Sequence, residues 1–137
     1  MYRLTASIAF VATTLLANGV AHSQTAKAPA EDIVTIYQLT DLEKDPSRFV
    51  RLQSTIFPPG GGNRFHRHPG DQWFAVQEGE LTYTVKGQPP RVMKAGDSVY
   101  IPRGTIHQTE NLTNANARSI ELNIMDKDKP FFEMVPE

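Results

Sequence analysis

The histidines of this 137-residue chain are concentrated in two short segments. Of the four histidines, His22 lies near the N-terminus, His66 and His68 lie in the stretch HRHPGDQW, and His107 lies in TIHQTEN. Residues i and i+2 of a β-strand point to the same side. A strand through RFHRH would therefore turn the imidazoles of His66 and His68 toward one volume, and a neighbouring strand can bring His107 alongside them.

Three imidazoles that converge on one volume form a competent transition-metal site. The alternative is that these histidines are hydrogen-bonded or exposed residues without a ligand role. All histidines beyond His22 fall in the two segments. We therefore expect His66, His68 and His107 to bind one divalent transition-metal ion (Fe, Mn, Ni, Zn or Cu).

The segments around the histidines have the pattern of short β-strands. Clusters of Gly, Pro and Asn separate them, as is typical of an all-β sandwich or barrel. The strand candidates beyond residue 49 are 50–57, 64–68, 72–77, 81–85, 91–94, 98–102, 105–111 and 118–125. Upstream, IVTIYQL (33–39) predicts a first strand. Thr40 with Glu43 three residues later predicts a short helical turn that Pro46 ends.

The first 23 residues have the pattern of a cleaved secretory signal. A basic start, MYR, precedes an uncharged and mostly apolar run at residues 4–21, and Ala21 and Ser23 stand three positions and one position before the expected cleavage site at Gln24. A membrane anchor is the alternative, but Thr, Ser, Asn and Gly dilute the run below the roughly 20 apolar residues that a spanning helix needs. We therefore predict an exported protein, periplasmic or secreted, without membrane attachment after cleavage.

The charge balance argues against some partners. The chain has 14 basic and 15 acidic residues, a formal net charge of −1. That balance predicts no binding to nucleic acid or to an anionic membrane surface. There is no cysteine, so neither a disulfide nor a thiolate ligand is expected.

Two spaced motifs resemble those of the cupins. The first cupin motif is Gly, five residues, His-x-His, three or four residues, Glu, six residues and Gly. The corresponding positions here are Gly60, His66, His68, Gln72 and Gly79. The second motif is Gly, five residues, Pro-x-Gly, two residues, His, three residues and Asn. The corresponding positions here are Gly96, Pro102, Gly104, His107 and Asn111.

The resemblance implies an all-β fold, a conical antiparallel β-barrel of the cupin or jelly-roll type, with a metal at its mouth or centre. The expected organisation is a signal peptide at 1–23, an N-terminal linker and first strand with a short helical turn at 24–49, and a cupin barrel at 50–137. Gly79 and Gly96 are expected at strand reversals with positive φ. Small cupins often pair through outer strands, and an outward-facing Trp73 is compatible with a homodimer.

Gln72 departs from the family, which usually has Glu at this position. One hypothesis is that the Gln72 amide oxygen is the fourth metal ligand, so that a divalent ion keeps its full charge and acts as a stronger Lewis acid. The other is a three-histidine site in which Gln72 hydrogen-bonds a water or the substrate. The spacing favours ligation.

Two polar side chains are catalytic candidates beside the metal ligands. Tyr83 could present its hydroxyl near the metal, and Arg64 could bind a substrate carboxylate, although a buried tyrosine and a lone arginine beside a turn more often have structural or solvated roles. Inward-facing Gln72, Phe74 and Val76 and the stripe 81–85 are expected to be mainly core. Phe74 stands where cupin sulfonium lyases have an aromatic hydroxyl, which argues against that chemistry.

Two function classes remain open. The first is a metal-dependent enzyme, dioxygenase-like or otherwise, that acts on a small oxygen-rich or carboxylate substrate by oxygenase, isomerase or lyase chemistry. The second is a non-enzymatic module that binds or senses a small sugar or carboxylate, since a fold does not fix a function.

Overall fold

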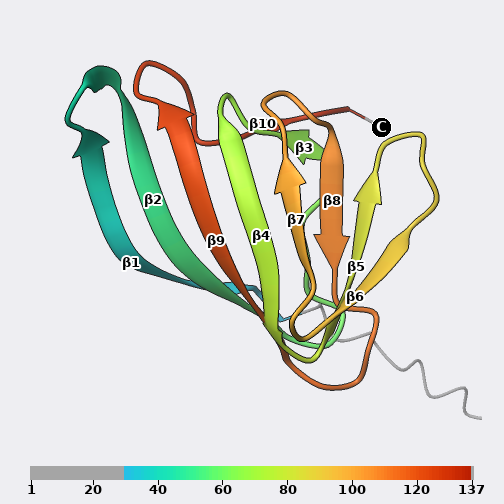
Figure 1. Cartoon of the computed structure of the whole chain (residues 1–137). Coiled ribbons are helices and arrows are strands. Elements are labelled where there is room, and N and C mark those ends of the chain that lie inside the picture. The colour runs from blue at the N-terminus through green and yellow to red at the C-terminus, as the bar shows by residue number, and fades with distance from the viewer. Residues whose placement is uncertain (1–29, 137) are drawn as a thin grey trace, which may run out of the picture.

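The computed structural model describes residues 30–136, and all regular structure within that range is β. Ten strands form two five-stranded antiparallel sheets that curve toward each other (Figure 1). One sheet has the order β1-β2-β9-β4-β7 and the other β10-β3-β8-β5-β6. The all-β antiparallel fold predicted from the sequence is confirmed. The predicted signal peptide, with His22, lies outside the described residues.

The strands alternate along the chain with the short turns expected from the sequence. Their bounds are β1 Ile33–Leu42, β2 Asp45–Phe57, β3 His66–Arg67, β4 Asp71–Glu78, β5 Glu80–Val85, β6 Arg91–Lys94, β7 Ser98–Ile101, β8 His107–Glu110, β9 Ala117–Asp126 and β10 Glu133–Met134. Each strand candidate overlaps one of these strands, and β10 is an addition. Gly79 and Gly96 have φ of 74° and 95° at reversals of the chain, as predicted.

The predicted helical turn in the segment 40–46 is wrong. β1 continues to Leu42, a turn at residues 43–44 follows, and β2 begins at Asp45. The two strands pair from Leu42 and Asp45 to Ile33 and Ile56. A capping interaction stabilises a helix by only about 1 kcal/mol, and an antiparallel ladder of nine residue pairs outweighs it. Residue 50, the expected start of the barrel domain, lies inside β2, which pairs along its length with β9.

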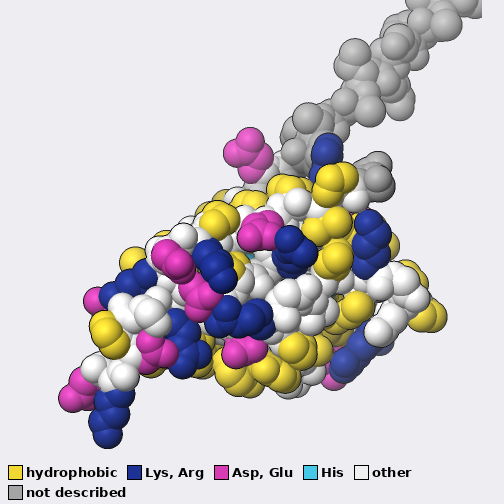
Figure 2. Space-filling view, turned by 90° about the horizontal axis from the view of Figure 1, so that it is seen from above, with side chains coloured by type: hydrophobic (Ala, Val, Ile, Leu, Met, Phe, Trp, Pro, Cys, Tyr) yellow, Lys and Arg dark blue, Asp and Glu magenta, His cyan; other side chains and the backbone are white. Residues whose placement is uncertain are grey.

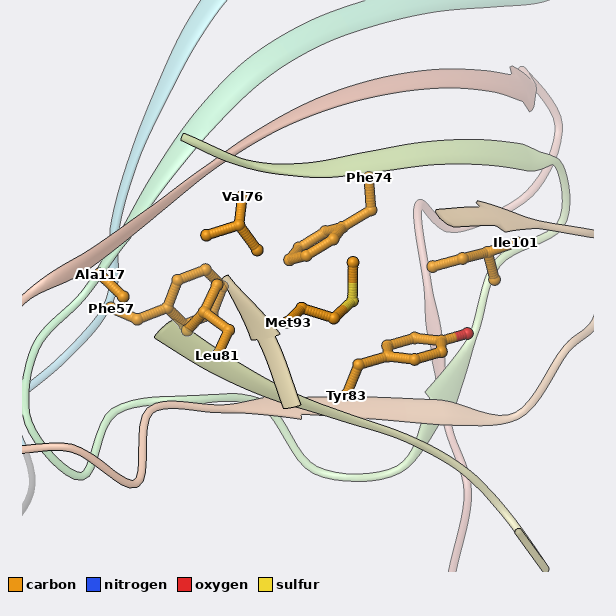
Figure 3. Close-up of a cluster of buried hydrophobic side chains, with 8 residues drawn as sticks. All are labelled: Phe57, Phe74, Val76, Leu81, Tyr83, Met93, Ile101 and Ala117. Atoms are coloured by element: carbon orange, nitrogen blue, oxygen red, sulfur yellow. The ribbon is translucent and has the colours of Figure 1, made fainter. Parts of the chain in front are cut away.

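The apolar core lies between the sheets (Figure 3). Side chains from β4 and β9 in one sheet meet side chains from β5 and β6 in the other. The buried cluster comprises Phe57, Phe74, Val76, Leu81, Tyr83, Met93, Ile101 and Ala117. The predicted alternation along β4 is confirmed, because Gln72, Phe74 and Val76 are buried whereas Trp73 is 43% exposed.

The outer surface mixes charges of both signs. Figure 2 shows lysine and arginine side chains interspersed with acidic ones, and no histidine among the described residues reaches this face. Within residues 30–136, no helix is long and apolar enough to cross a membrane.

Candidate metal centre

The three predicted histidines meet at one point of the sheet β10-β3-β8-β5-β6. His66 on β3 is the direct cross-strand partner of His107 on β8, and His68 follows β3. One ring nitrogen from each of the three lies within 4.8 Å of those of the other two. All three side chains are buried, with 2–6% of their surface exposed. The geometry predicted from the i, i+2 spacing and a neighbouring strand is therefore present.

Each imidazole is held in one tautomer by a backbone carbonyl. The Nδ1–H groups of His66, His68 and His107 donate to the carbonyl oxygens of Arg64 (2.8 Å), Phe131 (2.8 Å) and Thr105 (2.9 Å). A histidine whose Nδ1 carries the proton keeps the Nε2 lone pair for a ligand, and such bonds also fix the ring orientation of metal-bound histidines. The lone pairs of the three Nε2 atoms are thus available to bind a metal ion.

Burial keeps these imidazoles neutral. Desolvation lowers the pKa of His66, and it lowers the pKa of His68 and of His107 to about 4. At neutral pH the site therefore presents uncharged nitrogen ligands, which is the form that binds a cation.

Gln72 lines the same cavity as the histidines and comes from the other sheet. It lies on β4, is 4% exposed, and donates from Nε2 to the Glu121 carboxylate at 3.3 Å. An ionised carboxylate only accepts hydrogen bonds, so this contact fixes the amide orientation. Its Oε1 is buried without a hydrogen-bond partner. A buried carbonyl oxygen without a partner costs about 1–3 kcal/mol, and a metal ion or a bound ligand would remove that cost.

Glu121 is the organising residue that sequence reasoning missed. It lies on β9 and is 6% exposed. Its Oε1 accepts from Thr55 (3.0 Å) and Ser119 (2.6 Å), and its Oε2 accepts from Gln53 (2.7 Å) as well as Gln72. Ser119, Glu121 and Asn123 alternate along β9, so a polar inward face could have been recognised from the i, i+2 pattern.

Position 70, between the histidines and Gln72, can hold only a glycine. A Cβ placed on Gly70 would lie 1.9 Å from the Ile124 carbonyl oxygen and 2.8 Å from the Ile124 carbonyl carbon. The backbone there packs directly against β9, so no larger residue fits. This close approach lets the chain pass from His68 into β4, so that Gln72 follows Gly70 by two residues.

The histidines open into a cavity of about 370 Å³. Gln72, Glu121, Gln53 and Thr55 line it with the three histidines, and so do Phe131 and Phe132 from the C-terminal segment. The cavity is also lined by two charged side chains that the sequence did not single out, Asp32 and Arg51. Burial raises the pKa of Asp32 to about 6, against the lowering effect of a hydrogen bond from the Gly62 backbone.

The two catalytic candidates from the sequence lie elsewhere. Tyr83 is 6% exposed and belongs to the apolar cluster of Figure 3; its ring centroid is 5.7 Å from that of His107, but the residue lines a different cavity. Arg64 is exposed, and only its carbonyl oxygen serves the site, through His66. Neither side chain lines the cavity that holds the histidines. Asn111 is fully buried and binds the backbone of Phe57 and Ala115.

The donor set suits a transition metal. Three neutral imidazole nitrogens and one amide oxygen are ligands that divalent iron, manganese, nickel, zinc or copper accepts. An ion held by these residues would be next to the cavity, and catalytic metal sites keep a coordination position open for water or substrate.

A family model for the cupin domain matches residues 54–123, just over half of the chain, and includes all four of these positions. The protein belongs to the cupin family. The recognition made from the two motifs is thereby confirmed.

Among curated proteins, the chain is 46% identical over 48 residues to the uncharacterized protein YdbB of Bacillus subtilis, which covers 34% of this chain and 42% of that protein. It is 36% identical over 52 residues to the dimethylsulfoniopropionate lyase DddQ of Ruegeria pomeroyi, which covers 38% of this chain and 26% of that enzyme. These matches span less than half of either relative.

Solved structures share the fold over most of the chain. An oxalate oxidase in complex with the substrate analogue glycolate is 27% identical, with a TM-score of 0.58 over 77% of this chain and 55% of that chain. A cupin-like protein of Thermotoga maritima is 25% identical, with a TM-score of 0.59 over 77% of each chain.

Proposed function

We propose that this cupin is an exported metalloenzyme that acts on a small oxygen-rich or carboxylate substrate. His66, His68 and His107 would hold one divalent transition-metal ion, with Gln72 as the fourth ligand. The observation that carries the proposal is the unpartnered, buried Oε1 of Gln72 beside three histidines whose Nδ1 atoms are already bonded.

The bound ion would supply Lewis-acid polarisation of a substrate oxygen. The residues of the chain do the rest. The carbonyls of residues 64, 105 and 131 keep the three rings oriented. Glu121 accepts the hydrogen bond from Gln72 Nε2, which leaves the amide oxygen of Gln72 free for a ligand. Phe131 and Phe132 line the cavity with aromatic rings.

The similar proteins support a carboxylate substrate. The oxalate oxidase structure contains glycolate, and both oxalate and glycolate are small carboxylates. The sequence match to the dimethylsulfoniopropionate lyase covers 26% of that enzyme, and its solved structure, which is 24% identical with a TM-score of 0.58 over 51% of that chain, shares the fold. Phe74 is a buried core residue here and offers no hydroxyl. The missing hydroxyl at this position argues against sulfonium elimination in this cavity.

The test begins with elemental analysis of protein purified without chelators, followed by oxygen uptake and product analysis with a panel of phenolic and sugar-acid compounds. The proposal expects about one metal per chain and turnover of a carboxylate. Saturable binding without product would support a binding module instead. Absence of bound metal after loading with each of the five candidate ions would refute the site.

We also propose export and pairing of two copies. The N-terminal segment supports export, and mass spectrometry of the exported protein should find Gln24, or a residue within a few positions of it, at the new N-terminus. Trp73 and Tyr100 form an exposed aromatic pair with ring centroids 5.0 Å apart on the outer face of the sheet β1-β2-β9-β4-β7, and this supports a homodimer. Trp73→Asp should then lower the mass measured by light scattering from two chains to one.

A further inference from the structure

Arg51 is a cation on the wall of the metal cavity that no acidic side chain neutralises by direct contact. It lies on β2 and lines the cavity. The ion pairs formed within residues 30–136 engage Arg48, Arg67, Arg103 and Arg118 but not Arg51. Its Nε atom is buried and has no hydrogen-bond partner. A buried guanidinium donor without an acceptor is costly unless something else binds it.

Phe131 fixes Arg51 beside the metal centre. The Arg51 guanidinium carbon lies 4.2 Å from the centroid of the Phe131 ring, a cation–π contact. The carbonyl oxygen of the same residue accepts the hydrogen bond from His68 Nδ1 at 2.8 Å. One residue therefore orients both a metal-binding imidazole and the guanidinium next to it.

The nearby carboxylate of Glu121 already accepts hydrogen bonds from other residues. Four donors bond to the two oxygens of Glu121, from Gln53, Thr55, Gln72 and Ser119. Glu121 therefore provides a favourable field for Arg51 without taking up its hydrogen-bonding capacity. An acceptor from outside the chain would satisfy the buried Nε, and an anionic acceptor would also balance the guanidinium charge.

Two oxygen acceptors share the cavity with Arg51. Gln53 is 4% exposed and gives its Nε2 hydrogen to Glu121, which leaves its Oε1 buried without a partner. Asp32 Oδ1 is likewise buried without a partner. Both residues line the cavity. These acceptors match hydroxyl groups, which can donate where a plain alkyl chain cannot.

We propose that Arg51 binds the carboxylate of the substrate and that Gln53 and Asp32 accept hydrogen bonds from its hydroxyl groups, so that the cavity selects a hydroxy-substituted carboxylic acid. Planar guanidinium groups bind carboxylates through paired hydrogen bonds. The cavity, about 370 Å³, lies within the range of small-molecule sites, about 300–1,000 Å³. The inference rests on the proposed function in one respect, that the other end of this acid faces the metal.

The experiment compares three probes on the full chain by isothermal titration calorimetry, with and without bound zinc. Gluconate has a carboxylate and several hydroxyl groups. Gluconamide replaces the carboxylate with a neutral amide, and hexanoate has the carboxylate but no hydroxyl. The parent should bind gluconate more tightly than either of the others. Arg51→Met should weaken gluconate binding by at least about tenfold, the usual effect of removing a charged hydrogen-bonding partner, while gluconamide binding and zinc stoichiometry stay unchanged.

Arg48→Met is the matched control, because Arg48 lies on the same strand, pairs with Asp45 and does not line the cavity. It should bind gluconate as the parent does. Arg51→Lys, which keeps the charge but not the paired geometry, should fall between parent and Arg51→Met. Zinc binding by each variant verifies that it is folded.

The outcomes separate this inference from the proposed function. Equal gluconate affinity in the parent and in Arg51→Met overturns the role of Arg51, and a parent that does not prefer gluconate to gluconamide and hexanoate overturns the substrate class. Either result leaves the metal site intact. Conversely, a chain that takes up no metal refutes the proposed function, while the metal-free titrations still measure the contribution of Arg51.

Discussion

Replacing Gln72 with glutamate restores the usual cupin residue. The structure predicts that this change lowers the unfolding free energy of the metal-free protein. In the parent, Gln72 Nε2 donates to Glu121 Oε2 at 3.3 Å in a buried position. Gln72→Glu puts a second carboxylate in that contact. Two unit charges 3.3 Å apart repel by about 5 kcal/mol at an effective dielectric constant of about 20.

Protonation sets an upper limit to this cost. A glutamate with an ordinary pKa takes up a proton at pH 7 for about 4 kcal/mol, less than the repulsion, and the neutral acid can donate to Glu121 as the amide did. The metal-free variant should therefore lose about 4 kcal/mol of unfolding free energy at pH 7 and about 1 kcal/mol at pH 5, since the cost falls by about 1.4 kcal/mol per pH unit. Urea denaturation of the parent and the variant at several pH values measures this difference.

The matched control moves the charge instead of adding one. The double variant Gln72→Glu with Glu121→Gln keeps one amide and one carboxylate in contact, and the Gln53 amide can turn over to accept from the new amide. It should recover most of the stability at pH 7. A single variant as stable as the parent across this pH range would refute the contact between Gln72 and Glu121.

Metal titration of the same variants tests the ligand assignment. If Gln72 Oε1 is a ligand, the introduced carboxylate should bind the ion more tightly and release about one proton per ion at pH 7, which calorimetry in two buffers detects. Its lower Lewis acidity should then slow a reaction that depends on polarisation. If Gln72 only orients substrate, metal affinity should stay nearly flat. A flat result would end the ligand assignment and leave a three-histidine site.

Three further variants probe other parts of the site. His107→Ala should abolish stoichiometric metal binding and the rise in melting temperature that bound metal gives; unchanged stoichiometry would contradict the site. Gly70→Ala should cost about 3 kcal/mol or more, because its Cβ would meet the Ile124 carbonyl at 1.9 Å, and urea denaturation measures this. Burial raises the pKa of Asp32 from 3.8 to about 6, so the native chain binds this proton more tightly than the unfolded chain, and the associated stability is lost as the pH rises through that interval. Asp32→Asn should remove this loss and leave the metal-free protein more stable above pH 6 by about 1 kcal/mol, a value discounted for partial exposure; identical pH profiles for parent and variant would contradict it.

The sequence predicted what depends on local pattern. The i, i+2 spacing of His66 and His68 and the turn glycines were enough for the metal-binding face and for most strand positions, because strand alternation and positive φ are properties of a few neighbouring residues. The error at residues 40–46 has the opposite origin. A local capping pattern predicted a helical turn, whereas pairing with β2, which the sequence does not display, extended β1 to Leu42.

The cavity wall depends on register between distant strands, and there the sequence was less informative. Arg51 and Glu121 are about seventy residues apart, and they share the site because β2 pairs with β9 over ten residues. Arg64 looked equivalent to Arg51 in sequence and sits closer to the histidines along the chain. In the structure Arg64 lies outside the strands and is exposed, whereas Arg51 on β2 lines the cavity.

Glu121 also explains why a neutral glutamine can occupy the usual glutamate position. The negative charge is still present, but it lies behind Gln72 and is reached through the amide hydrogen. A carboxylate that accepts a hydrogen bond from a ligand makes that ligand a better electron donor, so the amide oxygen gains basicity without becoming an anion. The ion would then have a nearby compensating charge while keeping its own charge undiminished toward the cavity. Glu121→Gln in the otherwise unchanged protein should therefore weaken metal binding although Glu121 is not itself a ligand, whereas the same change made together with Gln72→Glu should not.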